Sequence, residues 1–147
     1  MKISKDFEEF FALLNQHKIE YLVIGGYAFA IYAEPRYTKD LDIFYRSDER
    51  NADKLLEVLS DFGFQSGSIT TKDLMRKGKI FQLGNPPLRI DLLNDIDGIS
   101  FNEAWQNRTS SEYGEEMIQV IGKNELIKNK RASGREQDQL DVKRLEE

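Results

Sequence analysis

Residues 39–45, KDLDIFY, combine a strand-like apolar pattern with two carboxylates at alternate positions. Side chains alternate between the faces of a strand, so Asp40 and Asp42 project from one face while Leu41 and Ile43 project from the other. Burying both acids without partners would be costly, because a carboxylate loses its hydration in a core. The pattern therefore predicts a strand with one face in the core and one face presenting an acid pair that a divalent cation would neutralise.

The rest of the chain alternates between helical and strand-like patterns. Helices are expected at residues 6–18, 27–33, 51–64, 100–105, 123–134 and 135–147. Strands are expected at residues 21–26, 39–45, 78–84, 88–93 and 115–122, with Asn85-Pro86-Pro87 joining the third and fourth. This order favours an α+β fold in one domain, residues 1–147, with a mixed sheet, helices packed mainly on one face, and helices at the C-terminus. It also places strands 21–26 and 39–45 side by side.

Composition excludes several classes of protein. The 147 residues contain no cysteine, which excludes disulfides and cysteine-based metal sites. The only histidine, His17, excludes a multi-histidine zinc site within one chain, and we interpret it as a surface residue. A net charge of −5 makes extended nucleic-acid binding unfavourable, although a local basic patch could hold one nucleotide. No apolar stretch is long enough for a membrane span, so a cytoplasmic protein is expected.

A third acid and a glycine pair complete a candidate site. Asp91 lies in the apolar run LRIDLL, where an aspartate needs a partner or a metal ion. Gly25 and Gly26 end the first strand, where they permit close approach of a ligand to the backbone and expose the N–H groups of the next helix to an anion. A phosphate-binding turn with three carboxylates on later strands suits phosphoryl or nucleotidyl transfer by magnesium ions.

The spacing of these motifs resembles a known signature. Gly25-Gly26, thirteen residues and then DLDI resemble the motif of the DNA polymerase beta–like nucleotidyltransferase superfamily. The segments YLVIGGYAFAIYAEPRYTKDLDIFY, GKIFQLGNPPLRIDLLNDIDGISFNEAW and LIKNKRASGREQDQLDVKRLE are similar to bacterial nucleotidyltransferase-like proteins related to the AbiEii abortive-infection toxins. The resemblance covers essentially the whole chain.

The resemblance implies a minimal nucleotidyltransferase fold that binds a nucleoside triphosphate with two magnesium ions. Its catalytic and metal-binding acids would be Asp40, Asp42 and Asp91, with Asp91 as the base. Its nucleotide-binding residues would be Gly25, Gly26, Arg36, Thr38, Lys130 and Arg135. Lys130 and Arg135 would then neutralise charge on the leaving pyrophosphate. From the residues alone, Arg36 could instead pair with an aspartate, and Asp138 and Asp141 could orient Lys130 or Arg135 by ion pairs.

Two functions remain open from the sequence. The first is magnesium-dependent transfer of a nucleotide to an acceptor hydroxyl on a small molecule, a protein or an RNA end, with a toxin–antitoxin-like role implied only by the resemblance. The second is a catalytically silent module that binds a nucleotide or a partner on the same fold. The short chain also leaves open a homodimer or a partner protein that completes the cleft. Neither the acceptor nor the preferred base follows from the sequence.

Overall fold

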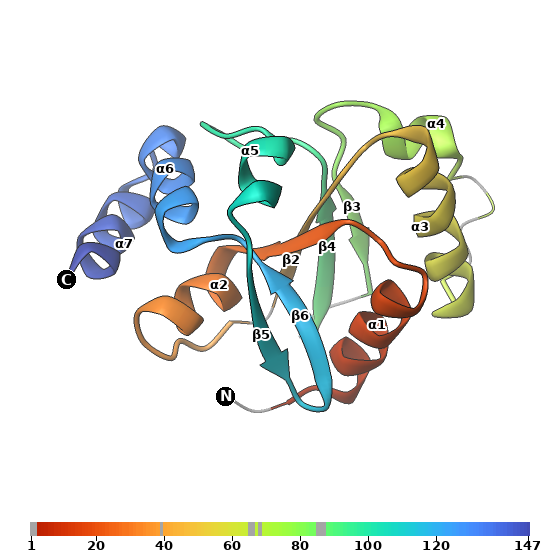
Figure 1. Cartoon of the computed structure of the whole chain (residues 1–147), viewed down its shortest axis with the longest axis horizontal. Coiled ribbons are helices and arrows are strands. Elements are labelled where there is room, and N and C mark those ends of the chain that lie inside the picture. Colours follow the sequence, from red (N-terminus) through yellow and green to blue (C-terminus); the bar gives the residue numbers. More distant parts are fainter. Residues whose placement is uncertain (1–2, 39, 65–66, 68, 85–87) are drawn as a thin grey trace.

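The computed structural model describes residues 3–38, 40–64, 67, 69–84 and 88–147. Its six strands form one sheet in the order β3-β4-β2-β1-β6-β5 (Figure 1). The strands are β1 (Tyr21–Ile24), β2 (Asp40–Tyr45), β3 (Phe81–Leu83), β4 (Arg89–Leu93), β5 (Thr109–Tyr113) and β6 (Glu116–Val120). The helices are α1 (Lys5–Gln16), α2 (Gly25–Tyr32), α3 (Glu49–Asp61), α4 (Thr71–Met75), α5 (Phe101–Gln106), α6 (Lys123–Ser133) and α7 (Glu136–Glu146).

The sheet is mixed, as the sequence predicts. Strand β2 lies at its centre, antiparallel to β1 and parallel to β4. Strand β1 is also parallel to β6, and the outer strands β3 and β5 pair antiparallel with β4 and β6. The expected adjacency of the first two strands is confirmed, and the strands that carry the three candidate acids, β2 and β4, are direct neighbours.

One face of the sheet forms the core with α1 and α3. Leu41 and Ile43 of β2 are fully buried on this face, as their alternation with the acids predicts. The apolar stripe of α1 packs against it, and the ring of Phe11 lies 6.2 Å from that of Tyr21 in β1. Ser4 begins α1 by accepting a hydrogen bond from the backbone N–H of Phe7 at 3.3 Å. This layer fixes β2 so that its acids must project from the opposite face.

The opposite face is only partly covered. At the C-terminal end of β2, Phe44 packs edge-on against Phe101 of α5, with ring centroids 5.1 Å apart. Trp105 stacks on Phe101, and both rings are partly buried against the core. Towards the start of β2 and β4 no comparable ring covers the acids in the part of the chain that the structure describes. That open stretch is the candidate site.

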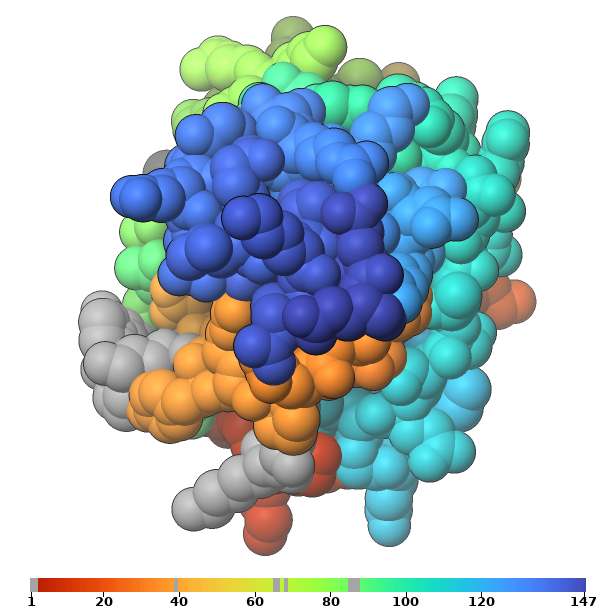
Figure 2. All heavy atoms as spheres, turned by 90° about the vertical axis from the view of Figure 1, so that its left-hand side faces the viewer, coloured from red at the N-terminus to blue at the C-terminus, as the bar shows by residue number. Residues whose placement is uncertain are grey.

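Helices α6 and α7 flank this open stretch. They form a hairpin around Gly134, which has a φ of 73° and ends α6 at the residue where the sequence predicts the break. Figure 2 shows the hairpin lying over α2 and the segment that follows it. Two segments more than 90 residues apart in the chain thus form one wall beside the sheet.

The structure corrects some sequence expectations. Strand β1 ends at Ile24, and the glycine pair forms the first two residues of α2 rather than a separate turn. The short helix α4 and the strand β5 were not anticipated, because α4 has five residues and β5 is a largely exposed polar edge strand. The junction at residues 85–87 lies outside the described residues. No helix among the described residues is both long and apolar enough to cross a membrane.

Candidate functional site

The three candidate acids share one face of the central strands. Asp42 of β2 lies directly opposite Asp91 of β4 in the register, and Asp40 lies opposite Arg89. Directly paired residues on neighbouring strands project to the same side, about 5 Å apart at the Cβ atoms. The Asp91 side chain is 13% exposed, whereas that of Asp40 is 42% exposed. The sheet therefore assembles the three carboxylates that the sequence predicted from separate segments.

Gly25 brings the start of α2 against these acids. Its φ is +67°, a conformation that side chains rarely adopt, and a Cβ there would collide with the carboxylate of Asp42. Ile24 precedes the helix and offers no side-chain oxygen to cap its first N–H groups. A helix start without such a cap is suited to bind an anion such as phosphate. The glycine is thus required both by backbone conformation and by the close approach of Asp42.

Arg89 makes direct contacts with two of the acids. Its Nε donates to Oδ1 of Asp91 at 2.9 Å, and its Nη2 donates to Oδ2 of Asp91 at 3.2 Å. The same Nη2 donates to Oδ2 of Asp40 at 3.0 Å. The hydrogen bond to Asp91 raises the pKa of the Arg89 guanidinium, which stays charged. Arg89 is therefore a cation built into the acid cluster.

Asp42 is the acid that this cation compensates least. Burial, together with the charges of Asp91 and Asp40, raises the pKa of Asp42 to about 7, against the opposing effects of Arg89 and Arg135. The raised pKa means that the ionised form of Asp42 is destabilised in the folded chain, and a nearby cation would stabilise it. Perturbed acids in a cleft are a frequent mark of functional sites.

A second charged cluster joins α6 and α7. The side chain of Lys130 is 7% exposed, and its Nζ lies 3.2 Å from Oδ1 of Asp138 and 3.0 Å from Oδ2 of Asp141. Arg135 donates from Nε to Oδ2 of Asp138 at 2.9 Å, and 79% of its side chain is exposed. The ion pairs that the sequence left open for Asp138 and Asp141 are present. Lys130 is held by two carboxylates, whereas the guanidinium of Arg135 faces solvent.

Arg36 is bound to this second cluster. It makes two hydrogen bonds with Asp141, at 3.1 Å from Nη1 and 2.6 Å from Nη2, and its guanidinium lies 3.9 Å from the ring centre of Phe29. Burial raises the pKa of Asp141, but the hydrogen bonds from Arg36, Lys130 and Gln137 outweigh it and lower the pKa to about 2. These contacts favour a structural role for Arg36, as a partner of Asp141, over a role in nucleotide binding.

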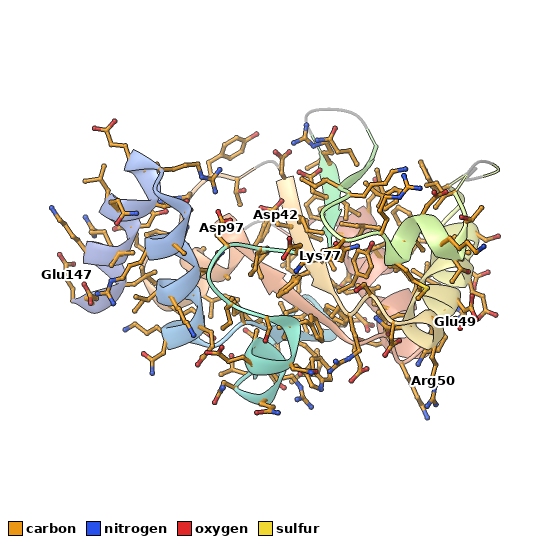
Figure 3. The ribbon with its side chains drawn as sticks, turned by 90° about the horizontal axis from the view of Figure 1, so that it is seen from above. Asp42, Glu49, Arg50, Lys77, Asp97 and Glu147 are labelled. Carbon is orange, nitrogen blue, oxygen red and sulfur yellow. The ribbon has the colours of Figure 1, made fainter. Side chains whose placement is uncertain are left out.

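A cleft of about 450 Å³ runs between the acid face and α6 (Figure 3). Its walls include six of the nine predicted site residues: Gly25, Asp40, Asp42, Asp91, Lys130 and Arg135. Gly26, Arg36 and Thr38 do not line it. Strand β2 begins at Asp40, and Thr38, which precedes it, packs beside Gly26.

Sequence reasoning missed other residues of the cleft. The polar ones are Arg89, Asn129 and Ser133, and the cleft is also lined by Asp95 and Asp97, which the sequence favours as capping or turn residues. Arg89 was accessible from the sequence, because it lies two residues before Asp91 in the same strand and so shares its face. Asn129 donates from its amide to the backbone oxygen of Asp97 at 2.9 Å, a contact between distant segments that no local pattern signals.

The acids can be tested for their fit to a metal ion. Among the described residues, no group of three or more His, Cys, Asp or Glu side chains is arranged to hold a metal. The reason is visible in the contacts of Arg89, which engage both Asp40 and Asp91. The donor chemistry itself suits magnesium, because carboxylate oxygens are the ligands that this ion prefers and a cation would relieve the repulsion at Asp42. The donor types thus fit the ion, and magnesium binding, like the number of ions, stays a prediction.

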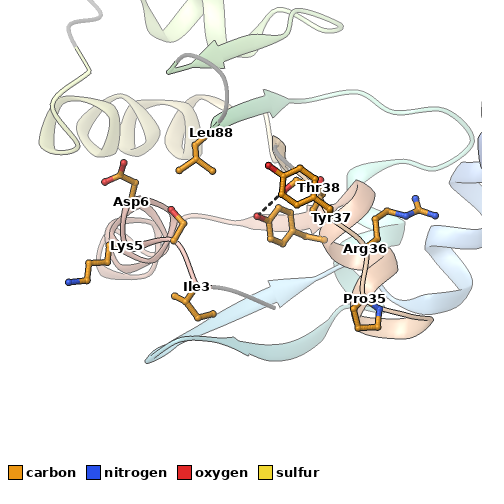
Figure 4. A pocket seen from close by; sticks show the side chains of 10 residues that line it. Ile3, Lys5, Asp6, Pro35, Arg36, Tyr37, Thr38 and Leu88 are labelled. Carbon is orange, nitrogen blue, oxygen red and sulfur yellow. Dashed lines mark hydrogen bonds between the residues drawn. The ribbon is translucent and has the colours of Figure 1, made fainter.

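A second hollow, of about 720 Å³, lies where the chain enters β2 and β4, beside the start of α1 (Figure 4). Tyr27, Tyr37, Thr38 and Leu88 line it together with the start of α1. Tyr37 is 81% exposed, so its ring is available to a ligand. Leu88 directly precedes Arg89 in the chain, although the hollow and the cleft share no lining residue.

Comparisons with known proteins agree with this geometry. The family model for aminoglycoside-2''-adenylyltransferase matches residues 6–145. The fold is similar to that of the lincosamide antibiotic adenylyltransferase LnuA in its lincomycin-bound structure, with a TM-score of 0.57, 16% identity, and coverage of 99% of this chain and 98% of that one. A comparison with curated protein sequences gave no significant match.

Two further solved structures share the fold. An antigenic nucleotidyltransferase-like protein from Paracoccidioides brasiliensis gives a TM-score of 0.55 at 16% identity over 95% of this chain and 72% of that one. A candidate nucleotidyltransferase from Thermotoga maritima gives a TM-score of 0.59 at 18% identity over 95% of this chain and 84% of that one. At these identities the structures show a common fold, and the family assignment comes from the sequence match.

Proposed function

The chain belongs to the aminoglycoside-2''-adenylyltransferase family and is thus a nucleotidyltransferase; on that premise we propose that it transfers the nucleotidyl group of a nucleoside triphosphate, with ATP the first candidate, to a hydroxyl of a small molecule. One observation carries the proposal. Asp42 and Asp91 lie opposite each other on the open face of the sheet, directly beside the uncapped start of α2 at Gly25. A triphosphate bound at that helix start would have its phosphates next to the acids.

The acids Asp40, Asp42 and Asp91 would hold magnesium. When bound, the ion would offset the charge of the triphosphate and lower the pKa of the acceptor hydroxyl. Asp91 would receive the proton of that hydroxyl, whose oxygen forms a bond to the α-phosphorus while the bond to the bridging oxygen of the β-phosphate breaks. Pyrophosphate leaves, and Arg135 at the cleft wall offers a positive charge to it.

Lys130 has a different part in the proposal. Its ammonium is nearly buried and already paired with Asp138 and Asp141. It therefore adds positive electrostatic potential to the cleft but is not free to move onto a phosphate. We assign phosphate binding to Arg135 and the positioning of the α6–α7 hairpin to Lys130. Arg36 belongs with Lys130 in that structural role.

A small-molecule acceptor is favoured by the second hollow. Its volume of about 720 Å³ lies within the usual range of small-molecule sites, roughly 300–1,000 Å³, and its exposed tyrosine offers an apolar surface with a hydroxyl. Its residues Thr38 and Leu88 lie just before β2 and β4, the strands that carry the acids. LnuA, which shares the fold, was solved with an antibiotic bound. The AbiEii relation and the toxin-like role have no structural observation in their favour and stay predictions.

The test uses a nucleoside triphosphate labelled at the α-phosphate, magnesium, and a panel of aminoglycosides and lincosamides. The wild-type chain is expected to move label to at least one compound, and Asp42→Asn and Asp91→Asn are expected to lose at least about 100-fold in rate. Asp97→Asn, at the same cleft but outside the acid cluster, serves as the matched control and should retain most of the rate. Undiminished transfer by Asp42→Asn would contradict the proposal.

One observation supports the alternative of a silent nucleotide-binding module. Arg89 already donates to two of the three acids, Asp40 and Asp91, and so offsets part of their charge without a metal. The alternative predicts nucleotide binding without label transfer to any compound in the panel.

A further inference from the structure

Part of the negative charge of the acid cluster is already offset by a side chain of the protein itself. The guanidinium of Arg89 donates two hydrogen bonds to Asp91 and one to Asp40, all between 2.9 and 3.2 Å. These carboxylate oxygens are the same ones that a divalent cation would use. Arg89 and a metal ion therefore compete for one set of acceptors.

The guanidinium of Arg89 is also placed so that it can leave. Its side chain is 28% exposed at the cleft, and it comes from the first residue of β4 rather than from the middle of the sheet. Arg36 differs, because its guanidinium packs over the ring of Phe29 and is locked onto Asp141. Lys130 differs too, since two carboxylates hold it in a buried position. Of Arg89, Arg36 and Lys130, only Arg89 is therefore placed to exchange its carboxylate partners for another ligand.

The new partner would be close at hand. The cleft that Arg89 lines also contains Gly25 at the start of α2, where the proposed triphosphate binds. A guanidinium is a good phosphate ligand, because its planar donors match two phosphate oxygens. Movement of Arg89 from the acids to a phosphate would free the acids for the metal and add a contact to the nucleotide.

We infer that Arg89 is an exchangeable counter-cation: it holds Asp40 and Asp91 in the empty site, a divalent cation must displace it to bind, and the released guanidinium then binds the triphosphate. The inference rests on the proposed metal and nucleotide site. Metal alone binds weakly, because it competes with Arg89. Metal and nucleotide together bind cooperatively, because the nucleotide gives the displaced guanidinium a partner.

The experiment is calorimetric titration of the full chain with MgCl₂ and with MnCl₂, without and with a non-hydrolysable ATP analogue. Arg89→Gln is expected to bind either metal alone at least about tenfold more tightly than the wild type. With magnesium present, the same variant is expected to bind the ATP analogue about tenfold more weakly. The matched control is Lys128→Gln, which removes an exposed cation that pairs with Glu103 and does not line the cleft. It should leave the affinity for metal alone unchanged.

Removal of Arg89 leaves three acids without a counter-charge, so Arg89→Lys provides a second variant. Lysine keeps the charge but lacks the fork that engages both carboxylates, and its affinity for metal alone should lie between those of the wild type and Arg89→Gln. Equal or weaker metal binding by both variants would overturn the inference and leave the proposed function intact. Absence of metal binding in every variant, even with nucleotide, would overturn both.

Discussion

Asp141→Asn tests whether the cluster around Lys130 holds the C-terminal hairpin in place. Asp141 is 2% exposed at its side chain and accepts hydrogen bonds from Arg36, Lys130 and Gln137. Asparagine has the same size but no charge. The substitution leaves Lys130 buried with only Asp138 opposite it and leaves Arg36 without its carboxylate.

The expected loss can be worked out in two ways. The pKa of Asp141 is lowered from 3.8 to about 2 in the folded chain, and a difference of about 1.8 units at 1.36 kcal/mol per unit is about 2.4 kcal/mol. Removing one partner of a buried ion pair costs about 3–5 kcal/mol in other proteins. We therefore expect Asp141→Asn to lower the free energy of unfolding by about 2–4 kcal/mol at pH 7.

The lowered pKa also determines how the contribution of Asp141 to the free energy of unfolding changes with pH. Because the pKa of Asp141 is lower when folded, its contribution is fully present above pH 4 and is lost as the pH falls towards 2. Urea unfolding followed by circular dichroism at pH 7 and at successively lower pH should show the two proteins converging in acid. Glu103→Gln is the control, since it breaks the exposed pair with Lys128 and should cost less than about 1 kcal/mol. A loss below 1 kcal/mol for Asp141→Asn at pH 7 would refute the reasoning.

Three further predictions concern the site itself. In EDTA, Asp42→Asn should be more stable than the wild type at pH 8 by up to about 4 kcal/mol. The reason is that the pKa of Asp42 is raised from 3.8 to about 7 on folding, so the wild type loses stability as the pH rises from 4 to 7. Thermal unfolding of both proteins at pH 4 and pH 8 checks this. Gly25→Ala should cost about 1–3 kcal/mol in urea unfolding and abolish nucleotide binding, whereas Gly67→Ala, which has open space, should do neither. Tyr37→Ala should raise the KM of the acceptor at least about fivefold and leave the KM of ATP unchanged in steady-state assays, while an equal rise in both would count against the second hollow as the acceptor site.

The acid face could be predicted because its signal is local. Alternation along a strand requires Asp40 and Asp42 to share a face, and the buried Leu41 and Ile43 confirm which face it is. The same rule places Arg89 beside Asp91, although the contact with Asp40 depends on β2 and β4 being neighbours in register. Register between strands 49 residues apart is a property of the whole sheet, so sequence reasoning gave the side of the strand but not the partner.

The placement of Arg36 shows where local reasoning ends. Its position shortly before the acid pair, together with the family resemblance, predicts a nucleotide contact, but β2 begins at Asp40 and Arg36 does not line the cleft. Its partner, Asp141, lies 105 residues later on α7. The i, i+3 spacing of Asp138 and Asp141 did indicate a shared helix face that could orient a cation. Which cations reach that face depends on how the hairpin packs over α2, and no periodicity in the sequence encodes this.

The account depends on a divalent cation and a triphosphate meeting at Asp40, Asp42 and Asp91 beside Gly25. Crystals grown with MnCl₂ and a non-hydrolysable ATP analogue, measured at the manganese absorption edge, test this most directly. The account predicts an anomalous peak within coordination distance of Asp40 and Asp42, with the phosphates at the start of α2 and Arg89 turned from the acids towards them. A nucleotide bound elsewhere, or an acid cluster still closed by Arg89 with no peak beside it, would contradict the account.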